Sequence, residues 1–351
     1  MSDGKQPRYV IVGAGAVGCT VGGLLARVGS RVVCVARPAL AGALRTGVDL
    51  KLNDQVIRVE AEAVTSIHDL APEINDIVMV TTKSQMTESV IGEVAGVYDK
   101  AQRIVCLQNG ASNEAIARHR FQNVYAGLVF FSAVQLEPAT ISLPQGLTVA
   151  IGCYPNGVDE IARQLCAELS EAGFDAVASA YVMAMKWGKL VANLNNATHA
   201  ITGYWLERGM AEPEMRLLML EVREEGLRVL DAAGIAVEPP AGEPSPIRIR
   251  EMTEKLKRPP DQSRGAAELP EERRTYASMW QDLMLGRRSS EVDFLNGEIV
   301  ELGRKLGIPT PYNSALLRIV NHMLEAKLKP GIHTPAELRA LIKSSSAQIQ
   351  N

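Results

Sequence analysis

The sequence predicts an α/β protein with a doubly wound parallel sheet in residues 1–180 and an all-α domain in residues 181–351. A short apolar strand at 9–12 runs into the glycine-rich turn GAGAVG and then into a helix-compatible segment that extends to Val28. Further apolar strands follow in the first half, but strand signals disappear after Tyr181 and apolar residues then recur at helical spacing. A length of 351 residues is also typical of two domains.

The glycine turn after the first strand predicts a dinucleotide-binding site. The turn comprises Gly13, Ala14, Gly15, Ala16, Val17 and Gly18. Gly13 suits the tight turn, Gly15 lets backbone N–H groups approach a pyrophosphate, and Gly18 allows close packing of helix and strand. The motif alone is weak, but its place between a strand and a helix, ahead of a second strand at 31–36, makes the interpretation specific.

The end of the second strand indicates which dinucleotide binds. An NAD site usually has an Asp or Glu there for the ribose 2′-hydroxyl, but this sequence reads Ala36-Arg37-Pro38. Because an arginine suits a 2′-phosphate, Arg37 favours NADP(H) over NAD(H). A solvated arginine at a strand end is the alternative interpretation.

Two further strands of the first half end in polar residues. Residues 76–82 lead to Lys83, and residues 103–108 lead to Asn109. Ligands of doubly wound sheets bind beyond the carboxyl ends of the strands, so we expect both side chains near the nicotinamide or the substrate. Asn109-Gly110 also fits an ordinary turn. The domain is completed by strands at 124–134, 147–152 and 174–178 and a helix at 159–172.

The second half is predicted to be helical. We expect helices at 181–202, 213–234, 271–286, 290–306, 312–327 and 335–343. Residues 237–270 are rich in proline and charge, and a segment of that length without secondary structure is usually functional or mobile. We expect a mobile loop beside the substrate site, with a folded insert as the alternative.

The helix expected from Tyr181 carries a polar stripe on an otherwise apolar segment. At about 100° per residue, Asn193 and Asn196 fall within about 40° of Lys189, whereas Asn195 points away. An amine and two amides on one helix face need either hydrogen-bond partners or a functional role, because burying them unpaired is energetically costly. A solvated stripe on an amphipathic helix is the alternative interpretation.

The composition argues against several classes of protein and site. A net charge of −3 and a pI near 6.0 give no field that would gather nucleic acid or anionic membrane. The five cysteines and five histidines are dispersed, so we expect reduced core cysteines and no metal site. The polar start MSDGKQPR does not fit a signal peptide, and no apolar run approaches membrane-spanning length, so we expect a cytoplasmic protein.

Together these motifs resemble the ketopantoate reductase family, the NADPH-dependent 2-dehydropantoate 2-reductases. The resemblance covers nearly the whole chain. It rests on GAGAVG, Val35-Ala36-Arg37, Thr82-Lys83, Leu107-Gln108-Asn109-Gly110, Trp187-Gly188-Lys189-Leu190 with Asn193, Ser278-Met279-Trp280-Gln281-Asp282, Ser290-Glu291-Val292-Asp293 with Asn296-Gly297, and Gly307-Ile308-Pro309-Thr310-Pro311. It implies a Rossmann-type domain, a helical domain of the 6-phosphogluconate dehydrogenase C-terminal type, and an active site between them.

The resemblance also implies catalytic roles. Lys189 corresponds to the general acid. Glu291 corresponds to a residue near the cofactor ribose, and we count it with Lys189 as a candidate catalytic residue. The chemistry agrees, because hydride transfer to a ketone builds negative charge on the carbonyl oxygen, which a nearby ammonium stabilises and then protonates. A second cation favours a lowered lysine pKa, and Lys186, one turn earlier, is the candidate for that cation.

The implied binding contacts are Lys83 on the cofactor side, Asn109 to substrate and nicotinamide, Asn193 to the substrate, and Ser278 to the substrate carboxylate. This chain departs from the family pattern at two places. The family's second asparagine is Ala197 here, and Asn196 is the candidate replacement. One extra residue also lies between Asp282 and Glu291, and a bulge or a shifted helix start must absorb it.

The sequence therefore predicts reduction of 2-dehydropantoate to pantoate with NADPH, a step of pantothenate biosynthesis. The expected partner is a small 2-oxo acid, and a homodimer is one candidate assembly. Three alternatives are a reductase of another 2-oxo acid or ketone, a dehydrogenase of the 6-phosphogluconate or β-hydroxyacid type, and a non-catalytic NADP(H)-sensing regulator. This chain has no G-x-x-G-x-G run ahead of Lys189, which argues against the second alternative, and the presence of that lysine argues against the third.

Overall fold

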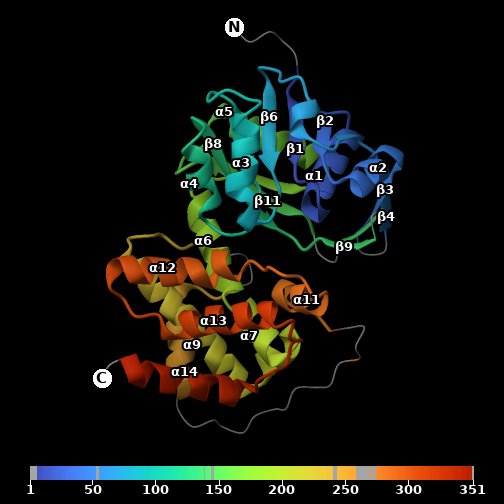
Figure 1. The fold of residues 1–351 in the computed structure, drawn as a ribbon. Coiled ribbons are helices and arrows are strands. Elements are labelled where there is room, and N and C mark those ends of the chain that lie inside the picture. Colours follow the sequence, from blue (N-terminus) through green and yellow to red (C-terminus); the bar gives the residue numbers. More distant parts are fainter. Residues whose placement is uncertain are drawn as a thin grey trace. The chain divides into compact units, whose positions relative to one another are not determined.

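The computed structural model describes residues 6–52, 55–137, 139–143, 146–239, 243–257, 270 and 274–349. The chain divides into two compact units, Met1–Lys186 and Trp187–Asn351, so the boundary lies later than the one expected after residue 180. It falls within helix α6, Val182–Asn193. In Figure 1 the first unit is coloured from blue to green, and the second from yellow-green to red.

The first unit is organised around a sheet of eight strands, counted among its described residues. Six of them run parallel, in the spatial order β5-β2-β1-β6-β7-β8. They are β1 Arg8–Val12, β2 Arg31–Val35, β5 Glu62–Val64, β6 Asp76–Val80, β7 Arg103–Cys106 and β8 Asn123–Phe130. Rossmann-type folds have this order, and their ligands bind where the order reverses, which here is between β1 and β6. The predicted Rossmann-type sheet is confirmed.

Two strands depart from the parallel arrangement that the sequence predicts. β11, Thr148–Cys153, pairs antiparallel with β8, and β12, Asp175–Ala178, pairs parallel with β11. The chain between β8 and β11 forms β9, Val134–Glu137, and β10, Thr140–Leu143, and its described residues contain no helix. A parallel neighbour requires a long crossover connection, usually a helix, so β11 returns in the opposite direction.

The sequence does not predict the second sheet of the first unit. This four-stranded sheet has the order β4-β3-β10-β9, with β3 at Val48–Leu52 and β4 at Gln55–Val59. The strand expected at 124–134 is therefore two elements, β8 and β9, which belong to different sheets. Figure 1 shows β3, β4 and β9 at one side of the first unit, beside α2, Pro38–Thr46.

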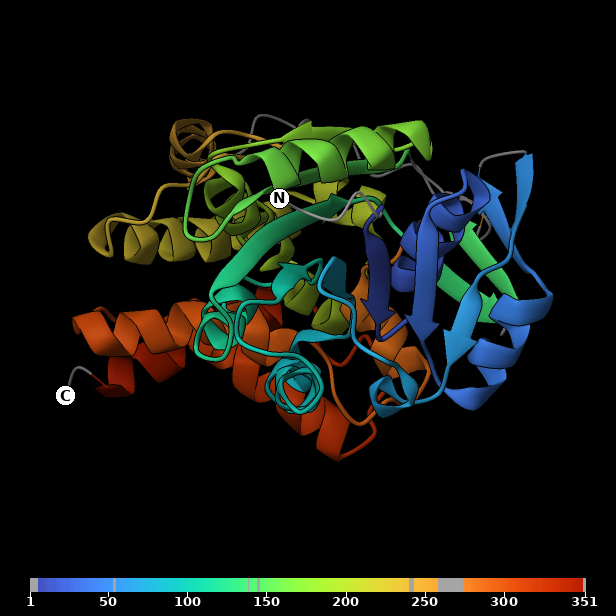
Figure 2. The same ribbon diagram turned by 90° about the horizontal axis from the view of Figure 1, so that it is seen from above.

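Helices cover both faces of the larger sheet, as a doubly wound fold requires. They include α1 Ala16–Arg27, α3 Thr87–Ala95, α4 Asn113–Arg118 and α5 Glu160–Glu171. Tyr9 of β1 belongs to the core formed with α1 and α5, whereas the next residue, Val10, belongs to the core formed with α3 and α4. Figure 2 shows α5 and α3 on opposite sides of the sheet.

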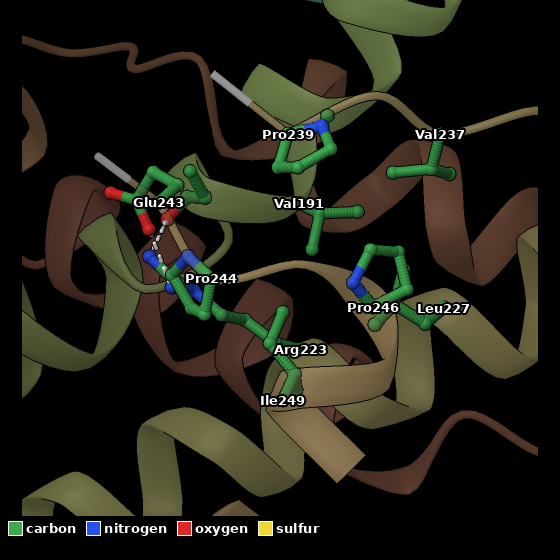
Figure 3. Close-up of a pocket in the computed structure, with 11 residues that line it drawn as sticks. Val191, Arg223, Leu227, Val237, Pro239, Glu243, Pro244, Pro246 and Ile249 are labelled. Carbon is green, nitrogen blue, oxygen red and sulfur yellow. Dashed lines mark hydrogen bonds and ion pairs between the residues drawn. The ribbon is translucent and has the colours of Figure 1, made fainter. Parts of the chain in front are cut away.

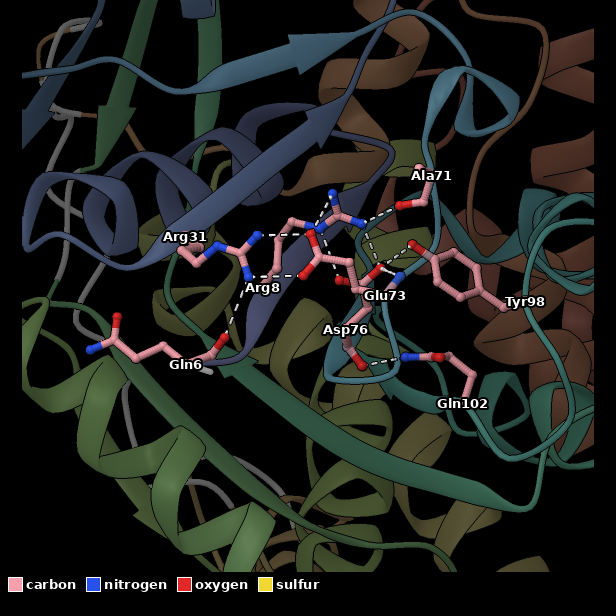
Figure 4. Close-up of polar contacts among 8 residues, drawn as sticks. All are labelled: Gln6, Arg8, Arg31, Ala71, Glu73, Asp76, Tyr98 and Gln102. Carbon is pink, nitrogen blue, oxygen red and sulfur yellow. Dashed lines mark hydrogen bonds and ion pairs between the residues drawn. The ribbon is translucent and has the colours of Figure 1, made fainter. Parts of the chain in front are cut away.

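A buried ion-pair network ties together the amino ends of β1 and β6 (Figure 4). Arg8 forms two hydrogen bonds with the Asp76 carboxylate, at 2.8 Å from Nε and 2.7 Å from Nη2. Tyr98 Oη donates to the same carboxylate at 2.7 Å. Because the glycine turn follows the other end of β1, this network supports the sheet and is remote from the expected ligand site.

The second unit contains helices and no strand among its described residues, which confirms the predicted all-α half. After α6 it has α7 Asn196–Thr202, α8 Leu206–Ala211, α9 Pro213–Ala232, α10 Pro246–Lys257, α11 Ser278–Met284, α12 Asn296–Leu306, α13 Pro311–Glu325 and α14 Pro335–Ile349. α9 is the centre of this unit, because α8, α10, α12, α13 and α14 all contact it. No helix in the described ranges is both long and apolar enough to cross a membrane.

The expected loop over 237–270 is wrong in part, because α10 lies within it. Ile249 and Thr253 are buried, and their spacing of one helical turn places both on the face that packs against α9. Residues 240–242 and 258–269, where the expectation of mobility also falls, lie outside the described residues. The helix expected at 181–202 is likewise two helices, α6 and α7, separated at 194–195.

Candidate functional site

The glycine turn begins where β1 ends, and its backbone bends sharply. The amide N–H groups of Gly13 and Ala14 both donate to the carbonyl of Val35, at 3.1 and 3.0 Å. Gly13 has φ +85°, a left-handed conformation that favours glycine. A Cβ on Gly18 would lie 2.5 Å from Thr81 Oγ1, so this position also excludes a side chain.

Gly15 leaves open space at the start of α1. A Cβ there would have no neighbour closer than Gly13 O, at 3.9 Å, so a ligand can approach the backbone. α1 begins at Ala16 without a side-chain cap and without an acidic residue in its first turn. First-turn N–H groups lack intrahelical partners and carry the positive end of the helix dipole, so this turn fits the phosphates of a dinucleotide. Ala14 is buried and Val17 is half-buried, so both contribute mainly backbone to the turn.

Arg37 lies directly beyond β2, two residues after the Val35 carbonyl that binds the glycine turn. Its side chain is exposed, and its guanidinium has no hydrogen-bond or ion-pair partner within the described ranges. Arg37 also precedes α2, which begins at Pro38. An uncommitted cation beside the phosphate turn suits the 2′-phosphate of NADP(H).

The chain segments that follow β6 and β7 are held at the same edge of the sheet as the glycine turn. Thr81 Oγ1 donates to Gly13 O at 2.9 Å, just before the half-buried Lys83. The carbonyl of Asn109 accepts from Ser84 Oγ at 2.6 Å and from Asn113 Nδ2 at 2.7 Å. These bonds fix the Asn109 backbone, and its side chain is half-buried. The structure thus brings Lys83 and Asn109 to the switch point of the sheet.

Lys186 is not an uncommitted second cation. Its ammonium forms a buried ion pair with Glu114 and donates to the carbonyl of Gln108 at 3.1 Å. Burial raises the pKa of the Glu114 carboxyl, and the Lys186 ammonium opposes that shift. Because the charges of this pair compensate each other, the expectation that Lys186 acts as a cation on Lys189 is wrong. The cause is the first turn of α6, which directs Lys186 into the core of the first unit.

The second unit contributes the other candidate residues. Lys189 and Asn193 are half-buried on α6. Asn196 is the first residue of α7, and its Nδ2 lies 3.5 Å from Oγ of Ser278, the first residue of α11. Ala197 is fully buried, so its side chain is not available to a ligand. The structure therefore brings Asn196 and Ser278 together.

The start of α11 is fixed by aromatic stacking on either side of Ser278. The rings of Tyr276 and Trp280 stack with centroids 3.7 Å apart and an interplanar angle of 18°. Glu291 is half-buried and immediately precedes a short 3₁₀ turn, Val292–Phe294. Residues 285–289, between α11 and Glu291, are exposed, so this surface segment has room for the extra residue without a bulge inside a helix.

Sequence reasoning missed two residues that hold neighbouring segments in place, Glu114 in the first unit and Arg223 in the second. Glu114 reads as an ordinary helix-start acid, and Arg223 reads as one charge in the EVREE stretch of α9. Their partners lie far along the chain, so no local spacing identifies them. Among the described residues, no group of three or more His, Cys, Asp or Glu side chains is arranged to hold a metal ion.

Two family models match the chain. The model for "Ketopantoate reductase PanE/ApbA" matches residues 9–156, and the model for "Ketopantoate reductase PanE/ApbA C terminal" matches residues 181–324. The 2-dehydropantoate 2-reductase of Pyrococcus horikoshii is 29% identical over 318 residues, which cover 89% of this chain and 96% of that protein. Sequence similarity thus extends over both units.

Solved structures have the same fold. The PanE/ApbA family ketopantoate reductase from Ralstonia eutropha has a TM-score of 0.74 at 29% identity, covering 91% of this chain and 99% of that one. D-mandelate dehydrogenase, solved with NADH and anilino(oxo)acetate, has a TM-score of 0.73 at 22% identity, with the same coverage of 91% and 99%. At that identity the second similarity concerns the fold alone.

Proposed function

The chain belongs to the ketopantoate reductase family PanE/ApbA, and from this premise we propose that it reduces 2-dehydropantoate to pantoate with NADPH. Relatives in this family are named 2-dehydropantoate 2-reductase, an oxidoreductase acting on a 2-oxo acid. The observation that carries the proposal is the pairing of Asn196 with Ser278 in the unit that also contains Lys189.

The cofactor assignment rests on the glycine turn and Arg37. The open backbone at Gly15 and the uncapped start of α1 would hold the pyrophosphate, and Arg37 would bind the 2′-phosphate. Lys83 and Asn109, after the neighbouring strands, would contact the nicotinamide half. NADPH supplies the hydride when bound. The arginine is the reason to propose NADPH where D-mandelate dehydrogenase was solved with NADH.

The chemistry that the protein supplies is charge stabilisation and a proton. As the ketone carbon accepts hydride, the Lys189 ammonium would stabilise the oxygen that becomes negative and then donate its proton to that oxygen. Asn193, Asn196 and Ser278 are neutral donors, so they would bind the carboxylate and hydroxyl of the substrate without adding a competing cation. Glu291 would act on the cofactor ribose or its surroundings.

A second candidate, reduction of another 2-oxo acid, is favoured by one observation. Asn196, and not residue 197, lies beside Ser278. If Asn196 replaces the family asparagine expected at Ala197, the displaced amide would favour a substrate with a different chain length or hydroxyl position. The pantothenate pathway role, a cytoplasmic location and a homodimer remain predictions.

The proposed function is tested by a panel of 2-oxo acids, each assayed with NADPH and with NADH, on wild type and Lys189→Ala. We expect 2-dehydropantoate with NADPH to give the highest kcat/KM. Loss of the general acid should lower kcat by about 10²- to 10⁴-fold while the Kd for NADPH changes little. Lys51→Ala, at an exposed position of the first unit, is the matched control and should retain activity. Unchanged turnover in Lys189→Ala would refute the catalytic assignment.

A further inference from the structure

The helix that carries Lys189 ends between the two candidate substrate asparagines. α6 ends at Asn193, α7 begins at Asn196, and the two residues between them, 194–195, form a turn. A helix interruption inside a packed unit leaves backbone carbonyls without their usual N–H donors, and buried carbonyls need other partners. The partners found at this turn show how its geometry is maintained.

Side chains from two other helices supply those partners. The carbonyl of Ala192 accepts from Arg223 Nη2 of α9 at 3.2 Å. The carbonyl of Leu194 accepts from Asn296 Nδ2 of α12 at 3.1 Å. Asn296 is itself held by Asn313 Oδ1 at 2.9 Å and is fully buried. Both sides of the turn are therefore anchored from outside the interrupted helix.

All three guanidinium nitrogens of Arg223 donate hydrogen bonds at or near the turn. Besides the Ala192 carbonyl, Nη1 donates to Glu243 Oε2 at 2.8 Å (Figure 3). With the Asn195 amide oriented so that its nitrogen donates to Met219 O at 3.1 Å, its oxygen accepts from Arg223 Nε at 2.9 Å. A planar guanidinium with several fixed donors is suited to holding such a turn, whereas a lysine ammonium is not.

The turn immediately precedes the side chain of α7 that lies beside Ser278. In an uninterrupted helix, Asn196 would lie within about 40° of Lys189, and residue 197 would lie about 40° from Asn193. In the structure Ala197 is fully buried and Asn196 is the residue 3.5 Å from Ser278 Oγ. The turn at 194–195 therefore sets where α7 begins, and its first residue, Asn196, is the amide that lies beside Ser278.

We propose that Arg223 is a positioning residue for substrate recognition, which acts by holding the turn between α6 and α7 so that Asn196 faces Ser278. This inference rests on the proposed reduction of a 2-oxo acid. Arg223 lies outside the reacting groups and acts through Asn196, so its loss affects substrate binding and selectivity more than proton transfer. Glu243, from the segment that precedes α10, keeps the guanidinium oriented.

The test is a double-mutant cycle of Arg223→Met and Asn196→Ala, measured with 2-dehydropantoate and a second 2-oxo acid. Each single change should lower kcat/KM about 10- to 100-fold, mainly by raising KM, and the double variant should lose little more than either one. The ratio of kcat/KM for the two 2-oxo acids should shift equally in the two single variants and the double variant. Arg223→Lys should recover only part of the loss, and the Kd for NADPH should be unchanged throughout.

Arg228→Met is the matched control, because Arg228 is an exposed arginine of the same helix that donates to Pro309 O. It should retain wild-type kinetics. Fully additive losses in the double variant, or an unchanged selectivity in Arg223→Met, would overturn the inference while leaving the proposed function intact. A wild-type enzyme that reduces no 2-oxo acid would overturn both. If Arg223→Met does not fold, Glu243→Gln removes one charge of the pair and should shift selectivity in the same direction.

Discussion

At the scale of single residues, His199 is a buried polar side chain that is held by a specific partner. His199, on α7, is almost fully buried, and its Nδ1 lies 2.9 Å from Tyr204 O. A carbonyl oxygen can only accept, so Nδ1 carries the proton in this contact. Burial lowers the pKa of His199, and the Tyr204 carbonyl opposes that shift. A neutral His199 is thus part of the folded state.

This predicts a pH dependence of stability. The folded-state pKa lies below the unfolded value of about 6.5, so the unfolded chain binds more protons as the pH falls through that value. The stabilising contribution is therefore complete above about pH 6.5 and is lost as the pH falls below it. Urea denaturation of wild type and His199→Gln at about pH 7.5 and about pH 5.5 measures this. The variant should show a smaller loss on acidification, and His119→Gln, at an exposed position, should behave like wild type.

At the scale of elements, close approach of backbones determines how the segment 237–239 lies against α6. A Cβ on Gly188 would overlap the carbonyl oxygen of Glu238, so the segment and the helix touch without a side chain between them. Val191, Pro239 and Pro246 line the small apolar space beside this contact (Figure 3). Gly188 immediately precedes Lys189, so a shift of this contact moves the helix position of the candidate acid.

Gly188→Ala is therefore expected to destabilise the protein and to lower kcat, in spite of the higher helix propensity of alanine. Overpacking at a tight contact typically costs about 1–3 kcal/mol of unfolding free energy. Gly92→Ala on α3 is the control, because a Cβ there meets open space and should be neutral or stabilising by up to about 1 kcal/mol. Thermal denaturation and steady-state kinetics of both variants give the comparison. Equal effects of the two changes would contradict this account of Gly188.

The elements also show which features a sequence predicts. The strand, glycine turn and helix around Gly13 follow from local spacing, and so do the buried strands that end at Lys83 and Asn109. The interruption at 194–195 does not, because the donors that stabilise it, Arg223 and Asn296, belong to helices far along the chain. The helical wheel assumed an unbroken helix, so it indicated Asn196, the residue found beside Ser278, but not the turn that precedes it.

At the scale of the whole molecule, the chemistry is distributed between the units by type. The first unit contains the glycine turn and Arg37, which are proposed for the cofactor, and the second contains the amides and hydroxyl proposed for the substrate. The sequence predicted the division into an α/β half and an all-α half well, because strand and helix periodicities differ over long segments. It did not predict the second sheet, since its strands are short and the pairing that joins β3 to β10 links segments distant in sequence.

Cofactor selection should be measurable in the stability of the whole protein. A ligand that binds only the folded state at about 100 times its Kd adds about 2.7 kcal/mol to the unfolding free energy. If Arg37 binds a 2′-phosphate, NADPH should raise Tm more than NADH at equal concentration, and Arg37→Ala should remove most of that difference. Arg27→Ala, on α1, is the control and should preserve it. Equal shifts from the two cofactors in wild type would exclude Arg37 as the selecting residue.

The Glu114–Lys186 pair has a consequence for cutting the chain into autonomous fragments. A fragment ending at residue 180, where the strand pattern stops, would contain Glu114 but lose the ammonium that compensates it. A carboxylate left unpaired in a core is destabilising by about 3–5 kcal/mol. A fragment designed to contain the first unit should therefore extend through Lys186, into a helix that the sequence assigns to the second half.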